Sequence, residues 1–457
     1  MAHSSVLFVA RHVRPDVTPV LQIQLKKGRA MANDYRQMWQ DLGLNMENHD
    51  ALLEVLGKVY GDTFLSQKNR PAKTDYLDFV MSEVHGLRIQ ELVDGKKTGK
   101  KVIGTYCTFV PEELVLAADC VMVGLCAGAD FATEAVEKYL PRNLCSLIKS
   151  TFGFKLGGVC PYLEASDMIV GENTCDGKKK AWEVFQGLVG NKLYVMDLPQ
   201  MKNSNAKSLL RSEYTRFKEA LEKLTGRQIT AESLKKAIGI VNEKRKAIYR
   251  LSALRAQDPS PISGLDSLLI NQIFFYEDPI RFTAKINELC DELEQRVAAK
   301  TGSAPAGTPR IMMSGCPMAV PNWKMPALIE TSGAIIVAEE SCVGERGTRN
   351  TVSGEGQSVD DLINNLVDRY LQIDCAIYTP NAERLAHIKE MSAKYKVDGV
   401  ILYTLQFCTP YSMESMGIEK ELEKLGIPAI RIETDYSQED VGQLKTRVQA
   451  FIERIRK

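Results

Sequence analysis

Cysteines are the residues of this chain whose type and spacing point most directly to chemistry. The 457 residues include 11 cysteines and 5 histidines. No two cysteines have the Cys-x-x-Cys spacing, which argues against zinc ribbons, thioredoxin motifs and bacterial ferredoxin sequences. The histidines lie outside every cysteine-containing segment, so mixed Cys/His zinc sites and Cys–His nucleophile pairs are disfavoured. Thiols that must act with one another suit an iron–sulfur cluster better than a site for a harder metal.

The composition is that of an ordinary globular protein and narrows the setting of these thiols. Apolar residues make up 44% of the chain and charged residues 25%, and 58 Lys+Arg balance 58 Asp+Glu. Without a cationic excess we expect no nucleic-acid partner, and no apolar run approaches the roughly 20 residues that cross a bilayer. The apolar run at 5–10 ends at Arg11 without a signal-peptide cleavage pattern, so we expect a cytoplasmic protein with free thiols.

Two series of short apolar runs predict the elements that position the cysteines. They alternate with helical patterns, which is typical of parallel sheets with right-handed crossovers. The first series is VIGTY at 102–106, VMVGL at 121–125, DMIVG at 167–171 and LYVMD at 193–197; the second is IMMS at 311–314, AIIVAE at 334–339, GVILY at 399–403 and AIRI at 429–432. The sequence therefore predicts an α/β fold with two similar domains, each built on a four-stranded parallel sheet flanked by helices.

Helical patterns fill the regions around the two expected sheets. The predicted units are an N-terminal helical segment at 1–98, a first α/β domain at 99–203, a helical insertion at 204–305 and a second α/β domain at 306–457. The small-residue run at 301–309 is typical of a linker, and the segment from Gln438 is typical of an amphipathic C-terminal helix. The chain is thus expected to contain two copies of one architecture.

The cysteines occupy matching positions in the two expected sheets. Cys107, Cys126 and Cys175 follow the first three strands of the first half, Cys316, Cys342 and Cys408 follow the corresponding strands of the second, and Cys145 and Cys375 lie between second and third strands. In open parallel sheets the ligand crevice lies beyond the carboxyl ends of the strands. We therefore expect these thiols to converge on one cleft between the domains.

Phosphate-binding motifs fail on spacing. GKKTGK at 95–100 and GENTCDGKKK at 171–180 have the wrong number of residues between their glycines, and neither has a hydroxyl residue after the lysine. No nucleotide site is expected on this chain. Lys178, Lys179 and Lys180 follow a strand-end cysteine, where a solvated first helical turn is favoured over a positive field on a cluster.

Seven segments together carry a family resemblance. They are GTYCTFVPEEL (104–114), LPRNLCSLIKSTFGF (140–154), VGENTCDGKKK (170–180), SGCP (314–317), EESCVGERG (339–347), DGVILYTLQFC (398–408) and IETDYSQEDVGQLKTRVQAF (432–451). The chain resembles the 2-hydroxyacyl-CoA dehydratase and benzoyl-CoA reductase superfamily, and within it the single-subunit double-cubane cluster proteins. The resemblance runs from about residue 100 to the end.

The resemblance implies cluster ligands. Superfamily dehydratase subunits hold one [4Fe–4S] cluster with three cysteines, which match Cys145, Cys175 and Cys408. A double-cubane [8Fe–9S] cluster needs six thiolates, and the other three would come from Cys126, Cys160, Cys316, Cys342 and Cys375. The internal repeat favours Cys126, Cys342 and Cys375, with Cys160 as the alternative. Cys107 and Cys316 are then thiols beside the cluster, and Cys120 and Cys290 are core residues.

The resemblance also implies an activity and partners. It implies an enzyme, an iron–sulfur oxidoreductase, active as a homodimer in anaerobic cytoplasm, that reduces a small substrate with electrons from an ATP-hydrolysing [4Fe–4S] activator. The alternatives are a [4Fe–4S] subunit of a 2-hydroxyacyl-CoA dehydratase, which is a lyase, and a cluster carrier. Glu172, Glu340 and Glu414 lie near strand-end cysteines and could supply protons, or could simply stabilise helix N-termini.

Overall fold

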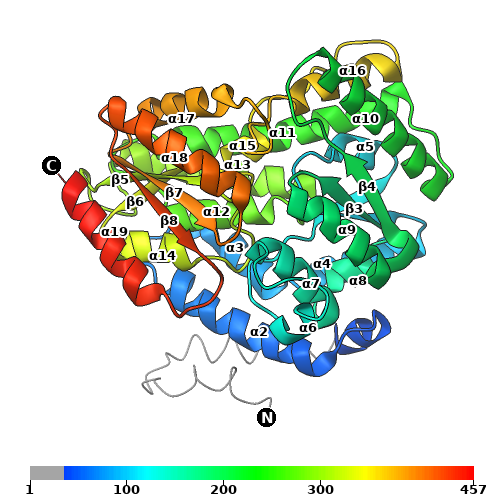
Figure 1. Ribbon diagram of the computed structural model, residues 1–457, viewed down its shortest axis with the longest axis horizontal. Coiled ribbons are helices and arrows are strands. Elements are labelled where there is room, and N and C mark those ends of the chain that lie inside the picture. The colour runs from blue at the N-terminus through cyan, green and yellow to red at the C-terminus, as the bar shows by residue number, and fades with distance from the viewer. Residues whose placement is uncertain (1–34, 457) are drawn as a thin grey trace.

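Residues 35–456 form two parallel sheets in the computed structural model, which describes these residues of the chain. The first sheet has the strand order β2-β1-β3-β4 and the second the order β6-β5-β7-β8. Helices flank both sheets, and the sheets lie at opposite sides of the molecule in Figure 1. The predicted α/β fold with two similar four-stranded parallel sheets is therefore confirmed.

All eight predicted strands are present, each within two residues of its expected ends. They are β1 (Lys101–Thr105), β2 (Cys120–Gly124), β3 (Met168–Asn173), β4 (Leu193–Asp197), β5 (Arg310–Gly315), β6 (Ile335–Glu340), β7 (Gly399–Leu405) and β8 (Ala429–Thr434). Strands β5, β6 and β7 are buried along their whole length, which explains why they read as continuous apolar runs.

Both sheets reverse direction at their first strand. From β1 the chain crosses to β2 on one side and returns to β3 on the other, and from β5 it crosses to β6 and returns to β7. A crevice forms at the carboxyl ends of the two strands where such a reversal occurs. Each half therefore offers a crevice where β1 meets β3 or β5 meets β7.

Helices occupy the regions where helical patterns were predicted. The N-terminal region contains α2 (Met46–Tyr60), the π-helix η2 (Gly61–Leu65), the 3₁₀ turn η3 (Ala72–Thr74), α3 (Asp75–Ser82) and α4 (Leu87–Lys97). The first half contains α5 (Glu112–Ala117), α6 (Thr133–Val136), α7 (Ser146–Leu156), α8 (Pro161–Ala165), α9 (Asp176–Val189) and η4 (Gly190–Lys192). The second half contains α14 (Lys324–Thr331), α15 (Glu345–Thr348), α16 (Val359–Tyr370), α17 (Ala382–Lys394), α18 (Thr409–Lys424) and α19 (Val441–Ile455). Residues 1–34 of the predicted N-terminal segment lie outside the described part of the chain.

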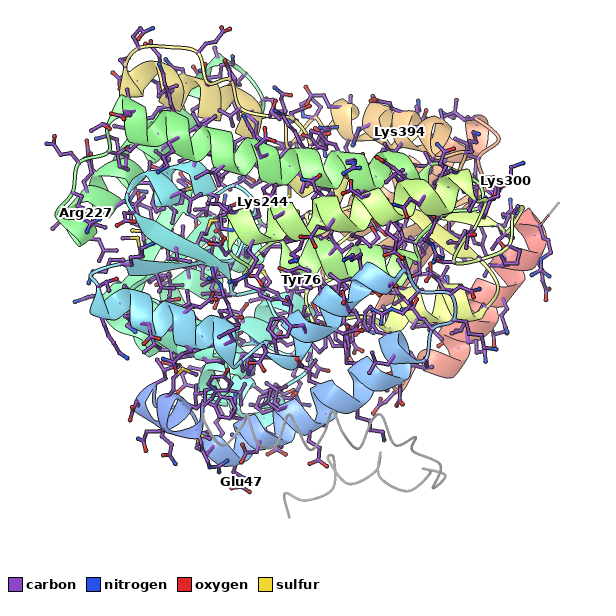
Figure 2. The ribbon with its side chains drawn as sticks, turned by 180° about the vertical axis from the view of Figure 1, so that it is seen from behind. Glu47, Tyr76, Arg227, Lys244, Lys300 and Lys394 are labelled. Carbon is purple, nitrogen blue, oxygen red and sulfur yellow. The ribbon has the colours of Figure 1, made fainter. Side chains whose placement is uncertain are left out.

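The helical insertion ties the two halves together. It consists of α10 (Ser204–Thr225), α11 (Ala231–Arg255), α12 (Gly264–Ile273) and α13 (Pro279–Ala298). Helix α11 contacts α5 in the first half and both α16 and β6 in the second (Figure 1). Its buried Lys244, labelled in Figure 2, donates to both carboxylate oxygens of Glu112 at 2.9 Å. Arg255 at its other end pairs with Glu339 of β6 at 2.6 Å.

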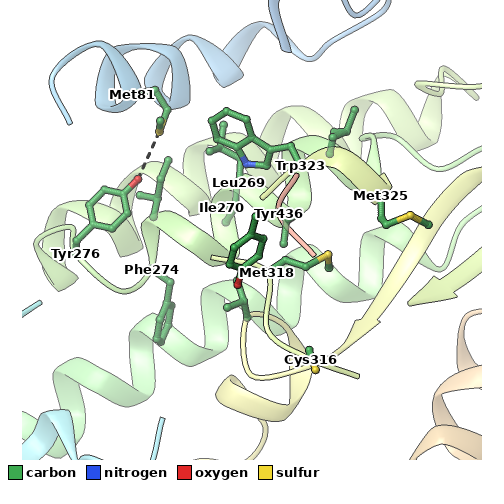
Figure 3. Packing of buried hydrophobic residues seen from close by; sticks show 14 of the residues in the cluster. Met81, Leu269, Ile270, Phe274, Tyr276, Cys316, Met318, Trp323, Met325 and Tyr436 are labelled. Atoms are coloured by element: carbon green, nitrogen blue, oxygen red, sulfur yellow. Dashed lines mark hydrogen bonds between the residues drawn. The ribbon is translucent and has the colours of Figure 1, made fainter. Parts of the chain in front are cut away.

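Dense packing fixes the segment after β5. Figure 3 shows Cys316, Met318 and Trp323 within one hydrophobic cluster. The Trp323 indole donates to Gln272 at 2.8 Å, and the Gln272 amide donates to the Met318 carbonyl at 2.7 Å. These contacts hold the loop that carries Cys316. Within residues 35–456, no helix has the length and apolar character needed to cross a membrane.

Candidate functional site

Thiols from both halves line one internal cavity of about 170 Å³. All eleven cysteines lie within residues 35–456 and are free. The eight that line the cavity are Cys107, Cys126, Cys145, Cys175, Cys316, Cys342, Cys375 and Cys408. The expected convergence of strand-end thiols is thus observed for all eight cysteines in the matching positions of the two sheets.

Three of these thiols stand at the N-termini of helices. Cys145, Cys175 and Cys408 are the N-cap residues of α7, α9 and α18. Helix N-termini present unpaired backbone N–H groups and the positive end of the helix dipole. A thiolate at any of these three positions is therefore stabilised without a charged side chain.

A glycine positions a fourth thiol. Gly315 ends β5 directly before Cys316 and has a φ of 140°, which side chains rarely adopt. A Cβ at this position would lie 1.9 Å from the carbonyl oxygen of Tyr403 in β7. The Cys316 amide donates to that same oxygen at 3.0 Å, and the Leu405 amide donates to the Cys316 sulfur at 3.4 Å. Close approach of β5 and β7 thus sets the place of the Cys316 thiol.

The eight thiols fall into two groups of four. The first thiol group is Cys145, Cys175, Cys316 and Cys408, in which Cys408 contacts Cys145 and Cys316 and Cys145 neighbours Cys175. The second thiol group is Cys107, Cys126, Cys342 and Cys375, in which Cys342 is an electrostatic neighbour of the other three. Each group contains residues of both halves of the chain, so neither half can assemble a group alone.

Burial keeps the thiols protonated in the metal-free protein. It raises the pKa of Cys126 to about 12 and that of Cys375 to about 11. Metal ions bind thiolates, so loading this cavity would release protons.

Lys178 is part of the cavity wall, contrary to the expected solvated helical turn. Its side chain is only 14% exposed, and its ammonium lies 3.4 Å from the Tyr106 carbonyl and 3.6 Å from a Glu172 carboxylate oxygen. Burial alone would lower the pKa of Lys178, but Glu172, Cys107 and the neighbouring thiols raise it. Lys179 and Lys180 are not buried, and Lys180 is exposed as expected. Only Lys178 reaches inward, because it lies one helical turn after the N-cap Cys175.

Arg346 is a second buried cation beside the thiols. Its guanidinium donates to Glu340 at 2.7 Å, approaches the Cys342 sulfur at 3.8 Å and contacts the Tyr411 hydroxyl. The Arg346 side chain is fully buried. A formal positive charge therefore lies directly behind the second thiol group.

The three acidic residues proposed as proton suppliers lie behind the cavity wall. Glu172 is buried beside Lys178, and burial raises its pKa although Lys178 opposes the change. Burial alone would raise the pKa of Glu340, but Arg346 and Arg384 hold it below its usual value. Glu414 pairs with Arg384. None of the three lines the cavity, and the proton-supply role stays a prediction for all of them.

The other cysteines lie away from the cavity. Cys160 is the N-cap of the five-residue helix α8 and packs near Ala127, Phe154 and Val159. Cys120 in β2 and Cys290 in α13 are buried in the core, as expected. The geometry therefore favours Cys126, Cys342 and Cys375 over Cys160 as companions of the other cavity thiols, and the ligand set stays a prediction.

The donor set fits a cluster with several irons. In the described part of the chain, no group of three or more His, Cys, Asp or Glu is arranged to hold a single metal ion. Among those described residues, the cavity lining contains no histidine or carboxylate and is otherwise largely apolar. Separate thiolates around one small cavity are the ligands that the irons of an iron–sulfur cluster take.

Sequence reasoning found the thiols but missed Arg346 and Tyr411. Arg346 follows Cys342 by four residues across an irregular turn and the short helix α15, so no periodicity relates the two. Tyr411 lies three residues after Cys408 in α18, a spacing that places it on the same helix face as the N-cap. That spacing, like the one between Cys175 and Lys178, could have indicated its place.

Comparisons with known proteins agree with this site. The family model described as 2-hydroxyglutaryl-CoA dehydratase, D-component, matches residues 107–455. The Escherichia coli protein YjiM, which is named as a dehydratase subunit, is 39% identical over 81% of this chain and 96% of its own. The (R)-phenyllactyl-CoA dehydratase beta subunit of Clostridium sporogenes is 30% identical over 78% of this chain and 92% of its own. A benzoyl-CoA reductase subunit of Thauera aromatica is 21% identical over 78% and 91%.

Proposed function

Because this chain belongs to the 2-hydroxyglutaryl-CoA dehydratase D-component family, we propose that it is an iron–sulfur oxidoreductase of the cytoplasm. It would hold a double-cubane [8Fe–9S] cluster and use low-potential electrons to reduce a small substrate. Relatives of this chain are named as subunits of both dehydratases and a reductase, so either reaction class has a precedent in the family.

The observation that carries the proposal is the division of the cavity thiols. The six cysteines predicted as ligands divide three and three between the groups: Cys145, Cys175 and Cys408 belong to the first, and Cys126, Cys342 and Cys375 to the second. Two linked cubanes with three protein ligands each need such a division. Cys107 and Cys316 add one thiol to each group.

The remaining cavity residues suit a small substrate. Leu147, Ile148, Phe275 and Val320 line the space beside the thiols and exclude bulk water from it. A bound iron–sulfur cluster would supply one-electron redox chemistry there. Lys178 and Arg346 compensate thiolate charge, and the Tyr411 hydroxyl is a polar group at the wall.

A separate protein would supply the electrons. The two glycine-lysine segments at 95–100 and 171–180 lack the spacing of a phosphate loop, so ATP hydrolysis belongs to an activator with its own [4Fe–4S] cluster. Several relatives are named as subunits, which supports a protein partner. The chain itself would form a homodimer.

A second candidate is a subunit of a 2-hydroxyacyl-CoA dehydratase, a lyase with one [4Fe–4S] cluster. The relative named as a phenyllactyl-CoA dehydratase subunit favours it. Cys145, Cys175 and Cys408 would then hold the cluster, and the second thiol group would hold no iron.

Anaerobic iron and sulfide analysis separates the two candidates. The double cubane predicts about eight irons per chain and the dehydratase subunit about four, whereas iron-free protein would contradict both. In the Cys342→Ala variant a double cubane loses part of its iron, and a single cubane keeps all of it. Cys160→Ala is the matched control, because Cys160 is also half-buried but lies outside the cavity. Iron loss in Cys160→Ala with full iron in Cys375→Ala would overturn the ligand assignment while leaving the cluster type intact.

A further inference from the structure

The two thiol groups differ in the charges that surround them. At Cys107 and Cys126 the attraction of Lys178 exceeds the repulsion from Glu172. Arg346 acts on the other two members of the second group, Cys342 and Cys375. Every thiol of the second group therefore has a buried cation as an electrostatic neighbour.

The first thiol group has mainly backbone and helix-end stabilisation. The strongest influences on Cys145 are Cys408, burial and the backbone N–H groups of Leu147 and Ile148. Cys408 is governed by neighbouring thiols, burial and the backbone of α18. Cys175 is the exception, because Lys178 also acts on it. Helix N-termini carry about half an elementary charge each, which is less than a buried ammonium or guanidinium.

The cations face the thiols with their counter-charges behind them. Lys178 lines the cavity, whereas Glu172 does not and leaves one carboxylate oxygen without a hydrogen bond. Arg346 contacts the Cys342 sulfur while Glu340 lies on its far side between Arg346 and Arg384. Both pairs are thus buried dipoles with their positive ends toward the second thiol group.

Resting on the double-cubane function proposed above, we propose that the two halves of the cluster are inequivalent and that Lys178 and Arg346 make the half held by the second thiol group the electron acceptor. One electron leaves the reduced cluster of the activator, which is oxidised, and adds to this half, whose charge becomes more negative by one. No bond breaks in this step. A buried positive charge favours the added electron because the low-dielectric interior screens it little.

Redox titration of three variants tests the role of Lys178. Lys178→Met should shift the equilibrium between reduced and oxidised cluster about tenfold toward the oxidised form, which for one electron is a midpoint about 59 mV more negative. Glu172→Gln, measured at mildly alkaline pH, should shift the midpoint the opposite way because it removes the opposing charge. Lys179→Met is the matched control, since Lys179 is a neighbour on α9 that does not line the cavity. Its midpoint should equal that of the wild type.

Two further variants test the location of the electron. In the Cys342→Ala background the remaining iron sits in the first group, so Lys178→Met should change the equilibrium less than about threefold. Arg346→Lys keeps the charge and should keep the midpoint, provided that iron content is full. An unchanged midpoint in Lys178→Met with full iron, or shifts of the same sign in Lys178→Met and Glu172→Gln, would overturn the inference. A wild-type protein with about four irons would instead refute the double-cubane function.

Discussion

Replacing Gly315 with alanine should damage both the fold and the site. The new Cβ would lie 1.9 Å from the Tyr403 carbonyl oxygen and 2.9 Å from its carbon, both backbone atoms of the neighbouring strand β7. No side-chain rotation can relieve this contact. Strand β7 is central in its sheet and is paired with both β5 and β8, so it cannot move away without loss of ladder hydrogen bonds.

The size of the effect follows from what must change. Rotating Gly315 to a negative φ breaks the hydrogen bond from the Cys316 amide to Tyr403, which contributes about 0.5–1.5 kcal/mol. Retaining the present φ of 140° with a Cβ costs about 1–3 kcal/mol more in backbone strain. Unfolding free energy should therefore fall by about 2–4 kcal/mol. Cys316 and its contact with the Leu405 amide should shift with the backbone.

Denaturant unfolding of the metal-free protein measures the stability change, and iron analysis after reconstitution measures the change at the site. Gly417→Ala in α18 is the matched control, because no atom lies within 4 Å of the position that its Cβ would take and alanine favours a helix interior by up to about 1 kcal/mol. Gly417→Ala should be neutral or stabilising. A Gly315→Ala protein with wild-type stability and full iron would refute the reasoning.

Three further predictions concern the framework. Lys244→Met leaves Glu112 buried without its partner and should lower the unfolding free energy by about 3–5 kcal/mol, measured by denaturant unfolding, whereas exposed Lys246→Met should have no effect. The buried pair of His49 and His85, whose ring nitrogens lie 2.9 Å apart, is stable only when neutral; burial lowers the pKa of His49 to about 4, so about 3 kcal/mol of stability should be present above pH 6.5 and be lost as pH falls toward 4, and a pH-independent denaturation midpoint would contradict this. Protease cleavage of the 301–309 linker should be slower in the loaded protein than in the metal-free protein, and equal rates would argue against a cluster that clamps the halves.

The strands and the convergence of thiols could be predicted from the sequence for a physical reason. Strands buried on both faces appear as continuous apolar runs, and β7 is buried from Gly399 to Leu405. The carboxyl ends of parallel strands share one edge, so a cysteine just after each strand must lie at that edge. Cys107, Cys126 and Cys342 each follow their strand by two residues, and this local information was enough to place them.

The charges around the thiols could not be predicted in the same way. Lys178 has the same sequence context as Lys179 and Lys180, and only the packing of α9 against the rest of the first half decides which of them is buried. Arg346 reaches Cys342 through an irregular turn, and Arg384, which shares the carboxylate of Glu340 with it, comes from the separate helix α17. Contacts that depend on tertiary packing leave no local pattern.

The framework also explains why a cluster would matter for the relation between the halves. Lys244–Glu112, Arg245–Glu113 and Arg255–Glu339 all join α11 to the two halves, and all are buried ion pairs. They hold the halves on the side of α11, and none of them involves a cavity thiol. On the cavity side the thiols of the two halves interact only as neutral, protonated groups when no metal is bound. A cluster that replaces those protons with shared thiolate ligands would therefore add its binding energy where the ion pairs of α11 do not act.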